Sequence, residues 1–181
     1  MILGDVGTGK TILTRKLLLE ALEEAEGTVT ALDFAPPAKV VSGLAVGGHL
    51  TYEEHPRLRH LKSNLIETPR LSARNSGELV RLAEQNSRIT EAMLREFTES
   101  PTKALFVNDS SIHLQRGSLD SLWRAFSAAE TVVANGYMGV SLKEDYGSGV
   151  SERERALMKR LAARMDDVIT LRDESRVESY E

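Results

Sequence analysis

Residues 4–11 read Gly-Asp-Val-Gly-Thr-Gly-Lys-Thr and match in full the pattern G-x-x-x-x-G-K-[S/T] of a phosphate-binding loop. In this pattern Gly4 and Gly9 let the backbone turn tightly, so that its N–H groups converge on phosphate oxygens. Lys10 supplies a point charge to the β- and γ-phosphates, and the hydroxyl of Thr11 is a ligand of Mg²⁺. We therefore predict that the chain binds a nucleoside triphosphate through Gly4, Asp5, Val6, Gly7, Thr8, Gly9, Lys10 and Thr11.

Strands and helices must hold this loop in place, and the hydrophobic pattern of the chain alternates between the two. Strands are expected before the loop and over residues 28–34, 104–107, 131–134 and 167–171, and helices over residues 11–26, 76–99, 118–129 and 151–165. The alternation predicts an α/β fold: a doubly wound, mainly parallel five-stranded sheet with the phosphate-binding loop after its first strand. Residues 1–171 are expected to form one nucleotide-binding domain, and residues 172–181 a charged tail that frays or is disordered.

Local signals refine the element boundaries. Ser76 is expected to cap the long central helix, and Ser151 with Glu154 forms the pattern of a capping box for the last helix. Residues 38–75 are less regular, and we expect a short helix within residues 56–65.

Polar side chains end several of the expected strands, and ligands on such sheets bind beyond the carboxyl ends of the strands. Asp109 follows the apolar run 104–107, which is the pattern of an acid that holds the Mg²⁺ bound by Thr11. Asp33 ends the second strand and is our candidate for the catalytic base, with strand capping as the alternative. Asn135 ends the fourth strand, where it either senses the γ-phosphate or forms a turn. The predicted catalytic residues are therefore Lys10, Asp109 and Asp33; the metal ligands are Thr11 and Asp109; and Asn135 joins the nucleotide site.

Two irregular segments are candidates for binding a ligand or partner in addition to the nucleotide. Residues 136–150 contain four glycines around Tyr137, Lys143 and Tyr146, which suits either a lid or an ordinary surface loop. Residues 49–74 are locally basic and could receive an anionic small-molecule acceptor or a protein partner; their positive residues are Arg57, Arg59, Lys62, Arg70 and Arg74. Arg153 and Arg155, at the start of the last helix, either approach phosphate or face solvent. Ser110 and Ser111 either add hydroxyls to the metal site or face solvent.

Composition narrows the class of protein. The 181 residues carry a net charge of -4, which argues against non-specific binding to nucleic acid. There are no cysteines, no apolar run approaches 18 residues, and no signal-peptide pattern occurs, so we expect a cytoplasmic protein without a membrane partner.

Only three residues precede Gly4, whereas buried strands usually run about five or six residues. Either the first strand is very short or the native chain begins upstream, and the second is our expectation.

From Gly4–Thr11, Asp109 and the expected order of strands, the chain resembles the P-loop NTPases, and within them the RecA-like division. RecA-like ATPases take their base from the region of Asp33. Asn135 resembles in its position the sensor residue of the additional-strand class. The division often takes an arginine from a neighbouring subunit, which makes a homo-oligomer one arrangement that the resemblance implies.

A looser similarity connects the chain with the adenosylcobinamide kinase/guanylyltransferase group. It rests on His55 and His60 with nearby arginines, on Ile66-Glu67, and on a TVVAN strand followed by a glycine loop and an arginine-rich helix. That group normally has Asn-Glu at the end of this strand, where this chain has Asn135-Gly136.

The resemblance implies ATP and Mg²⁺ as cofactors, because the guanine motif N-K-x-D does not occur. Many motor-type P-loop ATPases have a catalytic Glu directly after the metal-binding Asp, and Ser110 stands at that position here. The first prediction is a Mg²⁺-dependent ATPase. The second is a small-molecule kinase or nucleotidyltransferase, and the third is a nucleotide sensor without catalysis.

Overall fold

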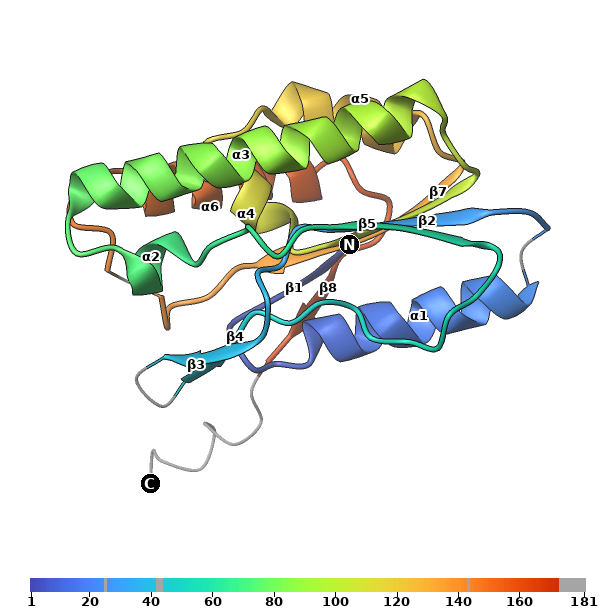
Figure 1. The fold of residues 1–181 in the computed structure, drawn as a ribbon, viewed down its shortest axis with the longest axis horizontal. Coiled ribbons are helices and arrows are strands. Elements are labelled where there is room, and N and C mark those ends of the chain that lie inside the picture. Colours follow the sequence, from blue (N-terminus) through green and yellow to red (C-terminus); the bar gives the residue numbers. More distant parts are fainter. Residues whose placement is uncertain (25, 42–43, 143, 173–181) are drawn as a thin grey trace.

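A parallel six-stranded sheet lies between helices on its two faces (Figure 1). The computed structural model describes residues 1–24, 26–41, 44–142 and 144–172, so Lys143 and the tail residues 173–181 lie outside the described part. The strand order is β5-β2-β6-β7-β1-β8. The strands are β1 (Ile2–Gly4), β2 (Val29–Asp33), β5 (Leu58–Lys62), β6 (Ala104–Asn108), β7 (Thr131–Tyr137) and β8 (Ile169–Leu171).

Helix α1 covers one face of the sheet, and four helices cover the other (Figure 1). A separate antiparallel hairpin pairs β3 with β4. The remaining elements are β3 (Lys39–Val41), β4 (Leu44–Val46), α1 (Lys10–Glu24), α2 (Pro69–Ser72), α3 (Ser76–Glu99), α4 (Ser110–Leu114), α5 (Leu119–Ser127) and α6 (Val150–Ala162). The predicted α/β class with a parallel sheet is thereby confirmed. No helix in the described residues is long and apolar enough to cross a membrane.

The predicted count of five strands is wrong, because β5 forms where a short helix was expected. Residues 58–62 carry charged side chains within the apolar pattern, which hides the strand in the sequence. In the fold this segment pairs with β2 along its whole length, from Val29 with Leu58 to Asp33 with Lys62. Leu58 packs on the α1 side of the sheet and Leu61 on the opposite side. Tertiary pairing at a sheet edge therefore decides the conformation of this segment.

Two predicted helix caps are also wrong. Asn75, not Ser76, caps α3 by accepting a hydrogen bond from the amide of Glu78 at 2.9 Å. Helix α6 begins after Gly149, and Glu154 does not close a capping box. Its carboxylate is instead drawn into a buried ion pair with Arg70, so tertiary contacts override the local pattern.

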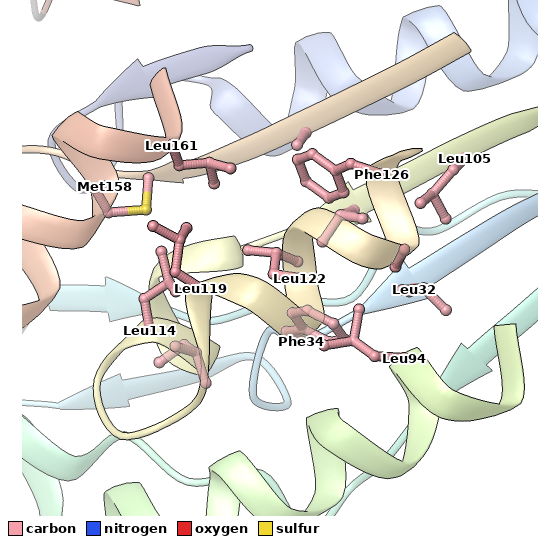
Figure 2. Packing of buried hydrophobic residues seen from close by; sticks show 14 of the residues in the cluster. Leu32, Phe34, Leu94, Leu105, Leu114, Leu119, Leu122, Phe126, Met158 and Leu161 are labelled. Carbon is pink, nitrogen blue, oxygen red and sulfur yellow. The ribbon is translucent and has the colours of Figure 1, made fainter. Parts of the chain in front are cut away.

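The main hydrophobic core lies between the sheet and the helices α3 to α6, and Figure 2 shows its packing. Leu32 and Phe34 come from the β2 region, Leu105 from β6 and Leu122 from α5, and all four are fully or almost fully buried. A second, smaller core lies under α1. Two cores of this kind fix the sheet from both sides, and with it the carboxyl ends of its strands.

His113 of α4 is buried inside the main core, and its environment favours the neutral ring. Burial is the largest cause of its lowered pKa; the Ser118 carbonyl, 3.0 Å from Nε2, opposes this shift, as does Glu91, while Arg153 adds to it. The hydroxyl of Thr90 lies 2.8 Å from Nδ1. Because the folded-state pKa lies below the unfolded value, the unfolded chain binds more protons between the two values, and stability falls as the pH drops below about 6.5.

We predict that a His113→Asn variant, which does not titrate, has a flatter pH dependence of stability than the unmodified chain. The difference in unfolding free energy between the two proteins should shrink by up to about 1.4 kcal/mol for each pH unit below about 6.5. Urea unfolding between pH 5 and pH 8 measures it. A difference independent of pH would contradict the neutral, buried ring.

Candidate functional site

The loop Gly4–Thr11 connects β1 to the start of α1 at the carboxyl edge of the sheet. Gly9 has φ of 86°, a left-handed conformation that favours glycine. The ammonium of Lys10 donates to the carbonyl of Asp5 at 2.5 Å, and the hydroxyl of Thr8 donates to the same oxygen at 2.9 Å. Burial is the largest cause of the lowered pKa of Lys10, with Asp109 and then Asp5 acting in the opposite direction. The loop thus holds a partly desolvated cation at the edge of the sheet.

Asp5 connects the loop to the segment that follows β7. Its carboxylate accepts hydrogen bonds from the amides of Val140 and Ser141 at 3.0 and 3.2 Å. Gly139 makes this approach possible, because a Cβ there would lie 2.3 Å from the carboxyl carbon of Asp5. Partial burial raises the pKa of Asp5, but hydrogen bonds from Val140, Val6 and Ser141 outweigh it and leave the pKa lowered. Asp5, predicted to bind the nucleotide, instead fixes the 139–141 segment.

Three polar side chains form a row across the carboxyl ends of neighbouring strands. Asp33 of β2 pairs in register with Asn108 of β6, and the amide of Asn108 donates to Asp33 Oδ1 at 2.8 Å. Asn135 of β7 donates to Asn108 Oδ1 at 2.8 Å and to the hydroxyl of Thr14 at 2.8 Å. Thr11 donates to Asn108 Oδ1 at 3.4 Å. The row therefore ties the start of α1 to three strands, and we refer to Asp33, Asn108 and Asn135 as the polar row.

Asp33 lies beneath the site rather than in it. The side chain is fully buried, and besides Asn108 it accepts from the amide of Leu50 at 2.6 Å and from that of Ala35 at 3.3 Å. His60 lies 3.3 Å from Asp33 Oδ2 and contacts the hydroxyl of Tyr52 through its other ring nitrogen. A carboxylate that is buried and fully hydrogen-bonded is suited to positioning Asn108, and this geometry does not bring it to a reacting water as the predicted base role requires.

Asp109 follows the polar row and occupies an unusual backbone conformation. Its φ of 62° and ψ of 56° lie in the left-handed region, which is strained for a residue with a side chain and clusters at functional sites. The amide of Asp109 donates to Asn135 Oδ1 at 2.9 Å, and the hydroxyl of Ser111 donates to the carboxylate. Burial is the largest cause of its raised pKa; Ser111, Lys10 and Arg70 oppose the shift. The hydroxyl of Thr11 thus donates its hydrogen bond to Asn108, which precedes the predicted metal ligand Asp109 by one residue.

A cavity of about 280 Å³ opens at this edge of the sheet. It joins most of the loop to the strand ends, and its walls include Val6, Gly7, Gly9, Lys10, Thr11, Asn108, Asp109 and Asn135. Gly4, Asp5 and Thr8, also predicted as nucleotide contacts, do not line it. The structure therefore brings Lys10, Thr11, Asp109 and Asn135 together in one cavity and leaves Asp33 outside it.

The far wall of the cavity contains residues outside the predicted nucleotide site. Arg70 belongs to the basic segment 49–74, which was a candidate for an anionic acceptor or a protein partner. It lines the cavity from α2, and of the five cations of that segment it alone does so. Gln115, just after α4, lies beside it. Strand alternation could have revealed Asn108, since it lies on the same face as Phe106, toward α1. No local sequence pattern predicts that Gln115 belongs to the site.

Several other predicted contacts lie elsewhere. Arg153 donates to the carbonyl of Gly117 at 2.8 Å, and Arg155 to that of Gly139 at 2.7 Å, so both arginines support loops. Ser110 and Ser111 are buried and do not face solvent. Of the pair, only Ser111 lines the cavity.

The oxygen donors in the cavity fit a magnesium ion that is shared with a nucleotide. Mg²⁺ prefers oxygen ligands and usually takes one or two carboxylates together with phosphates and water. Thr11 offers a hydroxyl and Asp109 a carboxylate to the same cavity, whereas the amide oxygen of Asn108 already accepts from Thr11 and Asn135. Within the described residues, no group of three or more His, Cys, Asp or Glu side chains forms a protein-only metal site. The donor set therefore suits a metal that arrives with phosphate.

Comparisons of the chain with protein-family models, with curated proteins and with solved structures found no match. Function must therefore be argued from the cavity and its residues.

We predict that Asp33→Asn lowers the free energy of unfolding by about 1–3 kcal/mol, the cost of a buried polar group without a suitable partner. The reason is that an amide at residue 33 has to turn an N–H group toward either Asn108 or Leu50, which already donate to this side chain. Urea unfolding measures the change, with the exposed Asp166→Asn as the matched control. Unchanged stability together with lost turnover would instead support Asp33 as the base.

Proposed function

We propose that the chain binds ATP with Mg²⁺ and hydrolyses it at the cavity between Gly4–Thr11 and the polar row. The observation that carries the proposal is that Lys10 and Thr11 share this cavity with Asn108, Asp109 and Asn135. A loop of this sequence between a strand and a helix supports phosphate binding, since backbone N–H groups and the helix N-terminus attract anions.

The strand order supports the same proposal. Strand β7 lies between β1, which leads into the loop, and β6, which ends at Asn108. A strand in this place is the feature for which the additional-strand class of P-loop NTPases is named. Asn135, whose position resembles that of the sensor residue of that class, lies on this strand and contacts Asn108. The absence of N-K-x-D from the sequence favours ATP over GTP.

The mechanism follows from the chemistry of the residues that line the cavity. The backbone of the loop and the ammonium of Lys10 bind the β- and γ-phosphates, and Lys10 leaves the Asp5 carbonyl to do so. Asn135 accepts from the amide of Asp109, which holds the strained turn in place, and its own amide nitrogen donates to Asn108 and Thr14. Asp109 orients the attacking water and accepts its proton, a role that its partly desolvated carboxylate suits. Asp33 positions Asn108.

Thr11 and Asp109 would hold the Mg²⁺, which neutralises charge on the phosphates when it is bound. The hydrogen bond from Thr11 to Asn108 places the Thr11 oxygen beside the residue that precedes Asp109. One oxygen of the Asp109 carboxylate accepts from Ser111, which orients the carboxylate.

We predict that Lys10→Ala weakens the binding of Mg²⁺–ATP by at least about tenfold, which corresponds to the loss of a hydrogen bond to a charged group. Isothermal titration calorimetry measures the affinity. Lys16→Ala is the matched control, because Lys16 lies on the same helix with its side chain 70% exposed. Equal affinities for the two variants would refute the loop as the nucleotide site.

We further predict that Asp109→Asn retains ATP binding within about threefold and lowers turnover by at least about a hundredfold, the contribution expected of general base catalysis. The amide keeps the size of the side chain and its contact with Ser111. Release of inorganic phosphate without any added acceptor gives the rate. Turnover near that of the unmodified chain would remove Asp109 from the mechanism.

A further inference from the structure

The far wall of the cavity holds a second cation, which the nucleotide site leaves unused. Arg70 has only 8% of its surface exposed, and its guanidinium lies 4.9 Å from the ring centre of Tyr137. One nitrogen of this guanidinium donates to both oxygens of Glu154, at 3.0 and 3.1 Å. Among the described residues, the other terminal nitrogen has only a 3.5 Å contact with the hydroxyl of Ser151. A buried cation on a cavity wall is a candidate anion site.

The acid that pairs with Arg70 lies behind it, outside the cavity. Glu154 lines a small adjoining pocket of about 20 Å³, whereas Arg70 lines both. In the described residues the charged side chains of the main cavity are therefore Lys10, Arg70 and Asp109, two cations and one acid. This balance of charge suits an anionic occupant in addition to phosphate.

Gln115 supplies an independent observation beside Arg70. The side chain is 1% exposed, and its amide nitrogen donates to Glu154 Oε2 at 2.8 Å, which fixes the direction of the amide. Its Oε1 is buried and has no hydrogen-bond partner among the described residues. Such an acceptor costs free energy unless a donor reaches it. Because Gln115 lines the cavity, a small turn of its side chain would bring Oε1 to a hydroxyl on a bound molecule.

We propose that Arg70 and Gln115 form a second binding subsite, for a small molecule that carries an anionic group and a hydroxyl. The anion contacts the guanidinium of Arg70, and the hydroxyl donates to Gln115 Oε1. At about 280 Å³ the cavity lies just below the range of about 300–1,000 Å³ for small-molecule sites, so the occupant is small. The proposal adds a second ligand to the nucleotide of the proposed function.

Glu154 gives this subsite a dependence on pH. Burial is the largest cause of its raised pKa, which reaches about 7 although Arg70 and Gln115 oppose the shift. A protonated Glu154 leaves the charge of Arg70 uncompensated, so the anion binds more tightly as the pH falls through about 7. In the part of the chain that the structure describes, the other charged or titratable groups that face Glu154 are Asp109, Tyr137 of β7 and Arg155 of its own helix.

Titration with isethionate, followed by NMR, tests the proposal. Isethionate carries a hydroxyl and a sulfonate whose charge does not change between pH 6 and pH 8. The chain is first saturated with Mg²⁺ and a non-hydrolysable ATP analogue, which fills the phosphate-binding loop. We expect saturable binding that is up to about tenfold tighter at pH 6 than at pH 8, following the fraction of Glu154 that is protonated. Ethylene glycol, which lacks the anion, should not bind.

Variants separate the contributions of the three side chains. Arg70→Gln should weaken isethionate binding at least about tenfold, while the exposed Arg124→Gln should leave it unchanged. Gln115→Leu should weaken isethionate but not ethanesulfonate, which has no hydroxyl. Glu154→Gln should bind isethionate more tightly and without dependence on pH. This variant keeps the size of the side chain, so the test survives even where Arg70→Gln fails to fold.

The same titration on Lys10→Ala without nucleotide keeps the two proposals apart. Isethionate binding in that variant, together with loss of ATP binding, supports both proposals. Isethionate binding in an unmodified chain that does not bind ATP would overturn the proposed function alone. Binding that neither Arg70→Gln nor Glu154→Gln changes, or no saturable binding in any of these proteins, would overturn the second subsite.

Discussion

The hydrogen bonds of the polar row are the interaction on which the site depends. Register puts Asp33, Asn108 and Asn135 on adjacent strands, all facing α1. Asn108 uses its whole hydrogen-bonding capacity there, since it donates to Asp33 and to the carbonyl of Gly48 and accepts from Asn135 and Thr11. A shift of any of these strands by one residue would turn its polar side chain into the opposite core. The row therefore fixes both the sheet register and the start of α1.

Much of this arrangement follows from sequence patterns alone. The loop, the helix after it and five of the six strands of the sheet are visible in apolar periodicity and in one specific motif, because each is encoded within a few neighbouring residues. The edge strand β5 was not foreseen, since charged residues interrupt its alternation and pairing with β2 stabilises it. The same reasoning missed Asn108. It selected the acid at the end of the apolar run, although alternation along β6 puts Asn108 on the face toward α1.

The far wall of the cavity lies beyond what sequence patterns reveal, because its contacts join distant segments. Arg70 and Glu154 are 84 residues apart. The local signal at Arg70 predicted a basic segment for an anionic acceptor or a protein partner, and the signal at Glu154 predicted a capping box. Burial of an ion pair is favourable only where its geometry and further hydrogen bonds offset desolvation. Gln115 supplies one such bond, and the ring of Tyr137 lies against the guanidinium. None of these contacts joins residues at a fixed spacing in the sequence, so no sequence motif reveals them.

The choice of an amide at residue 108 has a physical reason. Asn108 touches the buried carboxylate of Asp33, and a second carboxylate at this distance would bring two like charges together away from water. The polar row can therefore hold one acid, and Asp33 provides it. The negative charge in the cavity comes from the next residue, Asp109, whose left-handed backbone conformation brings its carboxylate there. Hydrogen bonds with Asn135 and Ser111 stabilise this conformation. The strained backbone at Asp109 and the amide side chain at Asn108 are both consequences of the buried carboxylate of Asp33.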